Sequence, residues 1–297
     1  KRQVESFSFT SLAEKILSAE GGSAVQTLSD AGRAVLVRRA LEELQDNVRY
    51  YYRHRRSAAF CQMAAETIDE LKSAGLSGTQ LAELARDCGP ESGKLSELAL
   101  IFQGYETLLA GTGMDPSDRL ELAGARLEEA LARHSLPEFL RDRAVFIDEF
   151  DTFNAPKKRL LGAMLAALPS VTVALCDDGA PLLPGDLSLF SGAKQVAAQL
   201  RQLARKNGAQ VAAPELLRRD LRHKDAPGLA ALTELLETGS CTPPESAPEL
   251  RLFAAASREE EARCVAAAIR RLMRQGVRCG KTVSYTHLRA HETVLDL

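Results

Sequence analysis

The chain lacks the features that mark membrane proteins and secreted proteins. It has no tryptophan, and aromatic residues make up only 5% of its 297 residues. No apolar run approaches the roughly 20 residues that a membrane-spanning helix needs. No secretory signal, with its basic start and apolar centre, opens the sequence. We therefore expect a cytoplasmic protein without a membrane partner.

Cysteine and net charge are equally uninformative about a ligand. The six cysteines are too scattered for a zinc or thioredoxin motif, so we expect reduced thiols. The formal net charge is −2, which gives no global attraction to nucleic acid. Any contact with DNA must therefore come from a local basic patch.

Both ends of the sequence look unlike those of a natural protein. The chain starts with Lys-Arg, and residues 283–297, VSYTHLRAHETVLDL, resemble the conceptual translation of a sequencing-library adapter. We expect 283–297 to be an artefact and 1–282 to be an internal fragment of a longer protein. His287 and His291, which have the spacing of a metal site, are set aside with it. CGKT (279–282) ends like a phosphate-binding loop but lacks the first glycine at the required spacing.

The apolar residues between positions 30 and 134 recur with the period of amphipathic helices. Asp115 and Pro116 are typical of a helix start, and Gly75 of a helix end. We expect an inserted all-α subdomain over 30–134. Its helices are predicted at 30–44, 58–75, 94–109 and 115–134.

Strands alternate with helices on both sides of this helical block. Residues 4–17 predict a short strand and then a helix, with Ser11 and Glu14 as its capping box. Beyond the block, the alternation predicts a parallel α/β sheet, so 1–29 and 135–237 together form a first α/β domain. The later elements are predicted at 144–147 (strand), 156–168 (helix), 171–175 (strand) and 192–207 (helix).

A second α/β domain is predicted to begin near residue 250. Residues 238–249 are rich in Pro and Ser and are typical of a linker. A strand over 250–256 and a helix over 257–276 follow. Ser257 and Glu260 form a capping box for that helix. We therefore assign 250–282 to the start of a second domain.

The main chemical signal is an acidic pair at the end of the strand 144–147. Magnesium prefers hard oxygen ligands, usually one or two carboxylates with substrate phosphates. Ligands bind parallel sheets at the carboxyl ends of their strands. Asp148 is therefore a candidate Mg²⁺ ligand in an ATP site, and Glu149 a candidate catalytic residue that orients water toward the γ-phosphate. A solvated turn would produce the same two residues.

A second candidate site is the basic, aromatic stretch RYYYRHRRS (49–57). Aromatic rings stack on bases and arginines follow phosphates, so Arg53, Arg55 and Arg56 are candidate DNA contacts. The alternative is that the tyrosines pack internally while the arginines are solvated. Two further basic stretches, PKKR (156–159) and LARKNG (203–208), are explained by a solvated helix start and by the helix dipole.

Two stretches resemble UvrD-type superfamily 1 helicases. IDEFDTFNAPKKRLL (147–161) is similar to their Asp-Glu box, and SFTSL (8–12) to a motif that they carry near bound DNA. The order and spacing of further stretches over 1–282 resemble the AddB (RexB) family of helicase–nuclease subunits. These stretches are SFTSLAEKIL, ETIDELKSAG, KLSELALIFQGYETLL, FIDEFDTFNAPKKRLL and LSLFSGAKQVAAQL.

This resemblance implies a RecA-like P-loop helicase-type parallel sheet, with its first strands missing, the inserted helical subdomain and the start of a second domain. It implies a subunit that processes double-strand DNA ends for recombinational repair with an AddA-like partner. ATP and Mg²⁺ are implied as cofactors, and an iron–sulfur cluster and a nuclease domain only in the missing C-terminal part. Ser8 and Thr10 are implied DNA contacts.

The sequence also departs from this pattern. Glu149 is present where the family often lacks it, so hydrolysis stays chemically possible. The stretch LCDDGAPLLPGD (175–186) lacks the pattern with which active UvrD-like motors sense phosphate. The alternatives are therefore a UvrD-like ATP-dependent motor and a non-enzymatic α/β scaffold.

Overall fold

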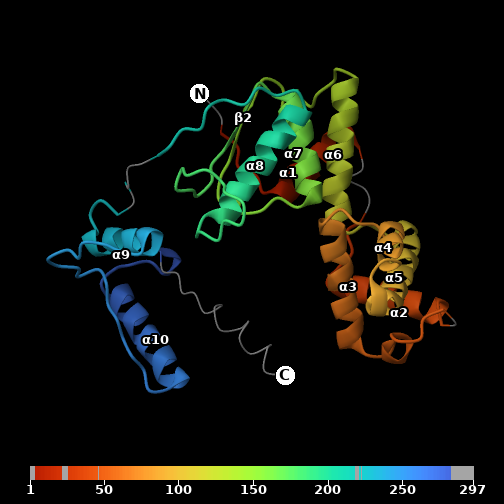
Figure 1. Cartoon of the computed structure of the whole chain (residues 1–297), viewed down its shortest axis with the longest axis horizontal. Helices are drawn as coiled ribbons and strands as arrows, with labels where there is room; N and C mark the ends of the chain where they lie inside the picture. Colours follow the sequence, from red (N-terminus) through yellow and green to blue (C-terminus); the bar gives the residue numbers. More distant parts are fainter. Residues whose placement is uncertain (1–3, 22–25, 46, 218–220, 222, 282–297) are drawn as a thin grey trace. The chain divides into compact units, whose positions relative to one another are not determined.

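Two short parallel strands and the helices around them carry the acidic pair (Figure 1). The computed structural model describes residues 4–21, 26–45, 47–217, 221 and 223–281. The predicted artefact at 283–297, with His287 and His291, lies outside them. The chain divides into two units, Lys1–Leu216 and Leu217–Leu297. The predicted domain boundaries stay predictions.

Strands β1 (Ala144–Ile147) and β2 (Ser170–Val173) pair in parallel, with Ala144 opposite Ser170 and Ile147 opposite Val173. Helix α7 (Ala155–Ala167) connects them, as parallel strands require. The predicted α/β class is therefore confirmed, as a mostly helical chain with a two-stranded parallel sheet among its described residues.

The first hydrophobic core lies between this sheet and four helices. α1 (Phe9–Glu20), α6 (Pro116–Ala132), α7 and α8 (Ser191–Lys206) pack together with one face of the strands. Because strand side chains alternate, Ile147 is buried whereas Phe146 is 76% exposed on the other face. The acidic pair thus follows a strand that is anchored from one side.

The second core belongs to the helical block. α2 (Asp30–Glu43), α3 (Ala58–Ser73), α4 (Gly78–Ala85) and α5 (Ser92–Ala110) bury a cluster around Phe102 and Tyr105. The predicted helices are confirmed within a few residues at each end, and α4 was not predicted. A 3₁₀ turn, η1 (Tyr52–His54), lies between α2 and α3, and a second, η2 (Gly89–Glu91), precedes α5.

The second unit contains α9 (Pro227–Thr238), α10 (Arg258–Arg274) and the 3₁₀ turn η3 (Cys279–Lys281). The predicted cap of α10 is confirmed, because the Ser257 hydroxyl accepts a hydrogen bond from the Glu260 backbone N–H at 3.2 Å. Gly276, at φ 90°, follows the helix as expected. No described helix is both long and apolar enough to cross a membrane.

Two predicted strands are wrong. Residues 4–8 and 250–256 have no regular structure, because neither segment pairs with a strand among the described residues. The predicted cap of α1 is also wrong. Ser8 is the N-cap, its hydroxyl accepts from the Ser11 backbone N–H, and Ser11 accepts in return from the Ser8 N–H. Glu14 instead pairs with Arg119.

Candidate nucleotide and DNA site

The acidic pair lies at the carboxyl end of β1, where a parallel sheet presents ligands. Asp148 and Glu149 are both exposed. One carboxylate oxygen of Asp148 accepts a hydrogen bond from the Glu149 backbone N–H at 3.0 Å. The second oxygen of Asp148 and the whole carboxylate of Glu149 have no hydrogen bond or ion pair among the described residues. Both acids are therefore accessible to a ligand.

Glu149 adopts a strained backbone conformation. Its φ is 63°, in the left-handed region that residues with a Cβ rarely enter. That conformation costs an L-residue on the order of 1–2 kcal/mol. Because strained residues concentrate at functional sites, the strain adds to the case for Glu149.

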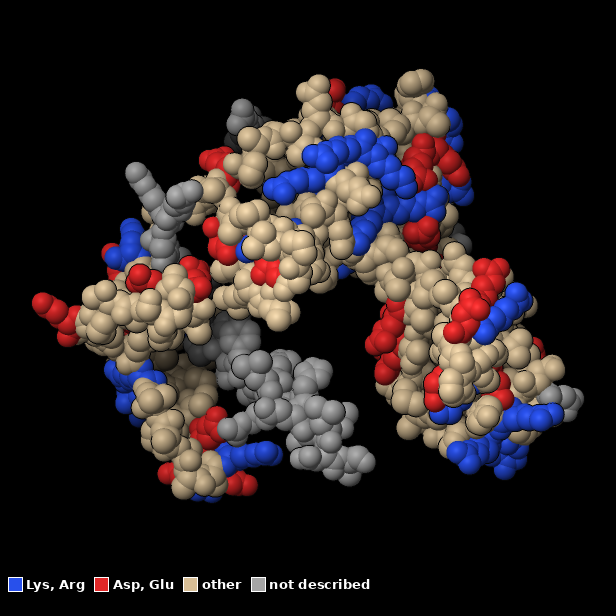
Figure 2. Space-filling view, in the orientation of Figure 1, with Lys and Arg blue, Asp and Glu red and all other residues tan. Residues whose placement is uncertain are grey.

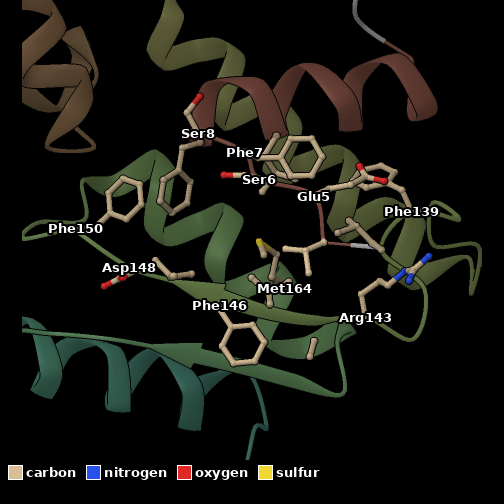
Figure 3. A pocket seen from close by; sticks show the side chains of 17 residues that line it. Glu5, Ser6, Phe7, Ser8, Phe139, Arg143, Phe146, Asp148, Phe150 and Met164 are labelled. Carbon is tan, nitrogen blue, oxygen red and sulfur yellow. The ribbon is translucent and has the colours of Figure 1, made fainter. Parts of the chain in front are cut away.

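A cavity of about 450 Å³ lies beside β1, between the strand and residues 4–8. Its lining is mostly apolar and includes Phe7, Phe139 and Met164. Figure 3 shows Asp148 at the same end of the cavity as Ser8 and Phe150. The structure thus brings one predicted DNA contact, Ser8, to the same cavity as the predicted metal ligand.

Ser8 and Thr10 lie at the start of α1, and both are exposed. The Ser8 hydroxyl is already engaged, because it caps α1 at 3.1 Å from the Ser11 nitrogen. The Thr10 hydroxyl has no such engagement with any residue that the structure describes. It is therefore the more available of the two for a phosphate or sugar oxygen.

An aromatic group next to the acidic pair was not predicted from the sequence. The Phe9 ring meets Phe150 edge-on, with centroids 5.0 Å apart, and meets Phe153 at 6.0 Å. The Lys157 ammonium lies 5.6 Å from the Phe150 centroid and 5.7 Å from that of Phe9. This packing holds the turn after Glu149 against the N-terminus of α1. Phe150, adjacent to the pair in sequence, was the available signal.

The basic stretch 49–57 is in the helical block and packs on the second core, not on the first. Tyr51 stacks on Phe60 with ring centroids 5.6 Å apart. The Arg55 guanidinium lies 4.0 Å from the centroid of the Tyr52 ring and donates to the Tyr52 carbonyl at 3.2 Å. Tyr50 is 56% exposed. The stretch therefore combines internally packed tyrosines with one ring open to solvent.

The charges of this stretch are not neutralised by acids in the part of the chain that the structure describes. Arg53 donates to the His54 ring nitrogen at 2.9 Å, and neither Arg55 nor Arg56 forms an ion pair there. The backbone before them is fixed by Glu97, a buried carboxylate. Glu97 accepts from the Arg49 and Tyr50 N–H groups, each at 2.8 Å. The arginines thus extend from a firmly anchored turn.

The loop after β2, which departs from the helicase pattern, is held by a buried lysine. The Lys194 ammonium donates to Asp178 at 3.0 Å and to Ser188 at 3.3 Å, and lies 3.5 Å from Asp186. A hydrogen bond from the Ala180 N–H, followed by that from Lys194, holds the pKa of Asp178 below its ordinary value. Asp178 is therefore a partner of Lys194 rather than a free ligand.

A second buried polar cluster links the helical block to α6, and we name it the Lys72 cluster: Lys72, Tyr105, Asp115 and Asp118. Lys72 donates to Asp115 at 2.9 Å and to Asp118 at 2.7 Å. The Tyr105 hydroxyl donates to Asp115 at 2.6 Å. The predicted capping role of the Asp115 side chain is wrong, because these two donors occupy its oxygens.

Burial and charge act in opposite directions on the Lys72 cluster. Burial alone would lower the pKa of Lys72, but the hydrogen bonds and charges of Asp118 and Asp115 outweigh it, and the pKa is raised. Burial, with the hydrogen bond to Asp115, raises the pKa of Tyr105 well above its ordinary value. Every polar side chain of the cluster is therefore satisfied within the protein.

The described residues fit magnesium only in the minimal way that nucleotide sites use. They contain no group of three His, Cys, Asp or Glu side chains placed to hold a metal ion. One free carboxylate oxygen on Asp148 is enough when phosphates supply other ligands. All six cysteines are free, as predicted from their spacing.

Comparison with known proteins identifies a family. A family model described as "ADDB, N-terminal" matches residues 2–233. Similar curated proteins are named as the B-type subunit of an ATP-dependent helicase/deoxyribonuclease. The protein from Desulforudis audaxviator is 33% identical over 279 residues, covering 90% of this chain and 23% of its own length. The protein from Moorella thermoacetica is 32% identical over 286 residues, covering 92% and 24%. The chain thus spans about a quarter of the length of these relatives.

Proposed function

Because the chain belongs to the AddB N-terminal family, we propose that it is part of the AddB-type subunit of an ATP-dependent helicase/deoxyribonuclease. The observation that carries the proposal is the family match over residues 2–233. The full-length protein would process double-strand DNA ends for recombinational repair, together with an AddA-like helicase–nuclease partner. An iron–sulfur cluster and a nuclease domain would belong to parts of that protein outside this chain.

The proposed fold around β1 is the RecA-like sheet of helicases. The parallel pairing of β1 with β2 and the acidic pair at the carboxyl end of β1 support it. Residues 4–8 lie across the cavity from the edge of β1 that β2 leaves free. In the complete sheet this segment would add a parallel strand at that edge and continue into α1.

The proposed ATP site uses the two exposed acids in different ways. The free oxygen of Asp148 would hold Mg²⁺, which supplies charge neutralisation for the phosphates when bound. Glu149 would accept a hydrogen bond from the attacking water and orient it. The left-handed backbone of Glu149 keeps the two carboxylates on successive residues of one tight turn. Lys157 and Phe150 would keep that turn in place.

The proposed DNA contacts fall into two groups. Ser8 and Thr10, beside the acidic pair, would bind the backbone of a single strand near the ATP site. Arg53, Arg55 and Arg56, on the helical block, would contact phosphates at a second place. Exposed Tyr50 would offer a ring for stacking next to these arginines.

A UvrD-like motor is the second candidate, because Glu149 retains the residue that hydrolysis needs. The test uses the full-length AddB-type protein, with and without its partner. If the proposal holds, linear duplex DNA is degraded in an ATP-dependent manner only when both proteins are present. If the AddB-type protein alone unwinds DNA and the partner adds nothing, the motor interpretation replaces it.

The role of Glu149 is tested in the same full-length protein. Glu149→Gln is expected to slow ATP hydrolysis by the AddB-type protein alone by about 100-fold or more, because general-base contributions have this size. Asp151→Asn is the matched control, since Asp151 is a nearby exposed acid and the change in charge is equal. Equal rates for both variants would remove Glu149 from the catalytic role.

A further inference from the structure

The structure brings together two basic stretches that are distant in sequence. The Lys158 ammonium on α7 donates to the Gln199 side chain on α8 at 2.7 Å. One turn further along both helices, a Cβ at Gly162 would come within 3.5 Å of the Leu203 side chain. The two helices therefore lie side by side and run in the same direction. PKKR (156–159) and RQLARK (201–206) thus contribute to one surface.

The cations of this α7–α8 surface have no acidic partners among the described residues. We define the surface by Lys158, Arg201, Arg205 and Lys206. None of the four forms an ion pair with any residue that the structure describes. The neighbouring Arg159 differs, because it pairs with Glu121 and Glu128 of α6. In Figure 2 a band of Lys and Arg crosses this part of the first unit, with acids beside it on the side of α6.

Helix stability does not explain this arrangement. The helix dipole favours Arg205 and Lys206 in the last turn of α8. It opposes Lys158 in the first turn of α7, a turn that contains no acidic residue. Arg201 lies before the last turn. A chain with a net charge of −2 therefore concentrates positive charge here for a reason other than the stability of the two helices.

The surface lacks the features of a protein interface. None of the large hydrophobic side chains exposed among the described residues lies on α7 or α8. The other large exposed side chains on α8 are glutamines, Gln195, Gln199 and Gln202. Protein interfaces are centred on apolar and aromatic anchors and are poor in lysine. Cations with amide donors and no anchor match a phosphate backbone instead.

The same surface favours duplex DNA over a single strand. Sites for single strands combine cations with exposed aromatic rings on which bases stack, and no exposed ring lies on α7 or α8. From Gln199 to Lys206 the α8 axis rises about 11 Å, which corresponds to roughly three base pairs. This is the reach of a few consecutive phosphates.

We propose that the α7–α8 surface binds the phosphate backbone of duplex DNA without reading its sequence. The inference rests on the proposed function, which supplies DNA as the substrate. It adds a contact separate from Ser8, Thr10 and the arginines of the helical block. It places duplex DNA along helices that begin at the edge carrying Asp148 and Glu149.

The test is a triple variant of the full-length AddB-type protein, Arg201→Gln, Arg205→Gln and Lys206→Gln, in complex with its partner. All three side chains are exposed, so folding should be preserved. Binding to a blunt labelled duplex is measured by fluorescence anisotropy over a range of salt concentrations. Each lost phosphate contact should reduce the slope of log K against log salt by about 0.9, so a total fall of about 2 to 3 is expected. Two duplexes of unrelated sequence should be affected equally.

A matched control removes the same charge from paired arginines. Arg38→Gln, Arg39→Gln and Arg126→Gln change net charge equally, but each of these arginines forms an ion pair with a glutamate on its own helix. The control should keep the salt slope of the unmodified complex. An equal fall in both triple variants would reduce the effect to overall charge and overturn the proposal.

Other outcomes also decide. An unchanged slope in the α7–α8 variant, with the unmodified complex binding normally, overturns the proposed surface and leaves the proposed function intact. A loss confined to single-stranded DNA overturns the choice of duplex. Failure of the variant to assemble with the partner, while the variant alone still binds DNA normally, assigns the surface to protein contact. If the unmodified complex binds no duplex, the proposed function falls, and this inference falls with it.

Discussion

The first unit contains two groups of charged side chains with opposite characters. In the Lys72 cluster, Asp115 is only 1% exposed, and both of its carboxylate oxygens accept hydrogen bonds from side chains. At the end of β1, Asp148 and Glu149 are exposed, and the described residues engage only one of their four oxygens. One group is satisfied by the protein, and the other is open to a ligand.

This difference separates structural charge from functional charge. A buried ion that loses its partner is left unpaired at low dielectric, so the fold depends on every member of the Lys72 cluster. An exposed acid keeps its hydration whether or not a ligand is bound, so the fold does not depend on the acidic pair. Variants of the first group should therefore lower the free energy of unfolding strongly, and variants of the second should change it little.

The largest effect is expected for Lys72→Met. The substitution leaves Asp115 and Asp118 without their shared cation, and breaking a buried pair costs about 3–5 kcal/mol. Urea denaturation of the purified chain, followed by circular dichroism, measures the loss. Arg39→Met is the control, because Arg39 pairs with Glu43 on an exposed helix face and should cost less than about 0.5 kcal/mol. Similar losses in the two variants would contradict the contrast.

Glu97 extends the satisfied group to the basic turn of the helical block. Glu97→Gln should cost about 2 kcal/mol, because hydrogen bonds from backbone N–H groups to a charged acceptor contribute more than neutral ones. Glu91→Gln is the control, since Glu91 is exposed and pairs with nearby Lys94. Equal denaturation midpoints for the two variants would show that the hydrogen bonds to Glu97 do not form in solution.

Alkaline pH should weaken the Lys72 cluster through Tyr105. Its folded pKa is raised by burial and by the hydrogen bond to Asp115, so its contribution is complete below the unfolded value near 10. Above that pH the unfolded state releases the proton and the folded state keeps it. The advantage of the unmodified chain over Tyr105→Phe should therefore shrink by about 1.4 kcal/mol per pH unit. Unfolding free energies at about pH 7 and about pH 11 test this. A constant difference would rule out the raised pKa.

Local patterns in the sequence predicted the helices, and non-local contacts explain the failures. The spacing of apolar residues and the Ser257–Glu260 cap depend on neighbours within a few positions, so α2, α3, α5, α6 and α10 could be predicted. A strand needs a partner that sequence spacing does not reveal. Residues 4–8 and 250–256 have strand-like composition but no pairing partner among the described residues.

The same limit applies to the sites. Asp148 and Glu149 are adjacent, so their exposure at the end of β1 followed from the pattern of one strand. Lys72 and Asp115 are separated by 43 positions, and their charge pattern alone is that of two solvated helix faces. The α7–α8 surface was hidden for the same reason, because each of its two basic stretches has an ordinary local explanation.

The smallest effect concerns the strained backbone at Glu149. Glu149→Gly removes the Cβ that disfavours a φ of 63°, whereas Glu149→Ala removes the carboxylate and keeps the strain. The glycine variant should therefore be more stable than the alanine variant by about 1 kcal/mol, measured by denaturation of the purified chain. An alanine variant of equal or greater stability would show that position 149 is not held left-handed in solution. A more stable glycine variant would mean that Glu149 occupies this position at a cost to folding, which only its role toward a ligand would justify.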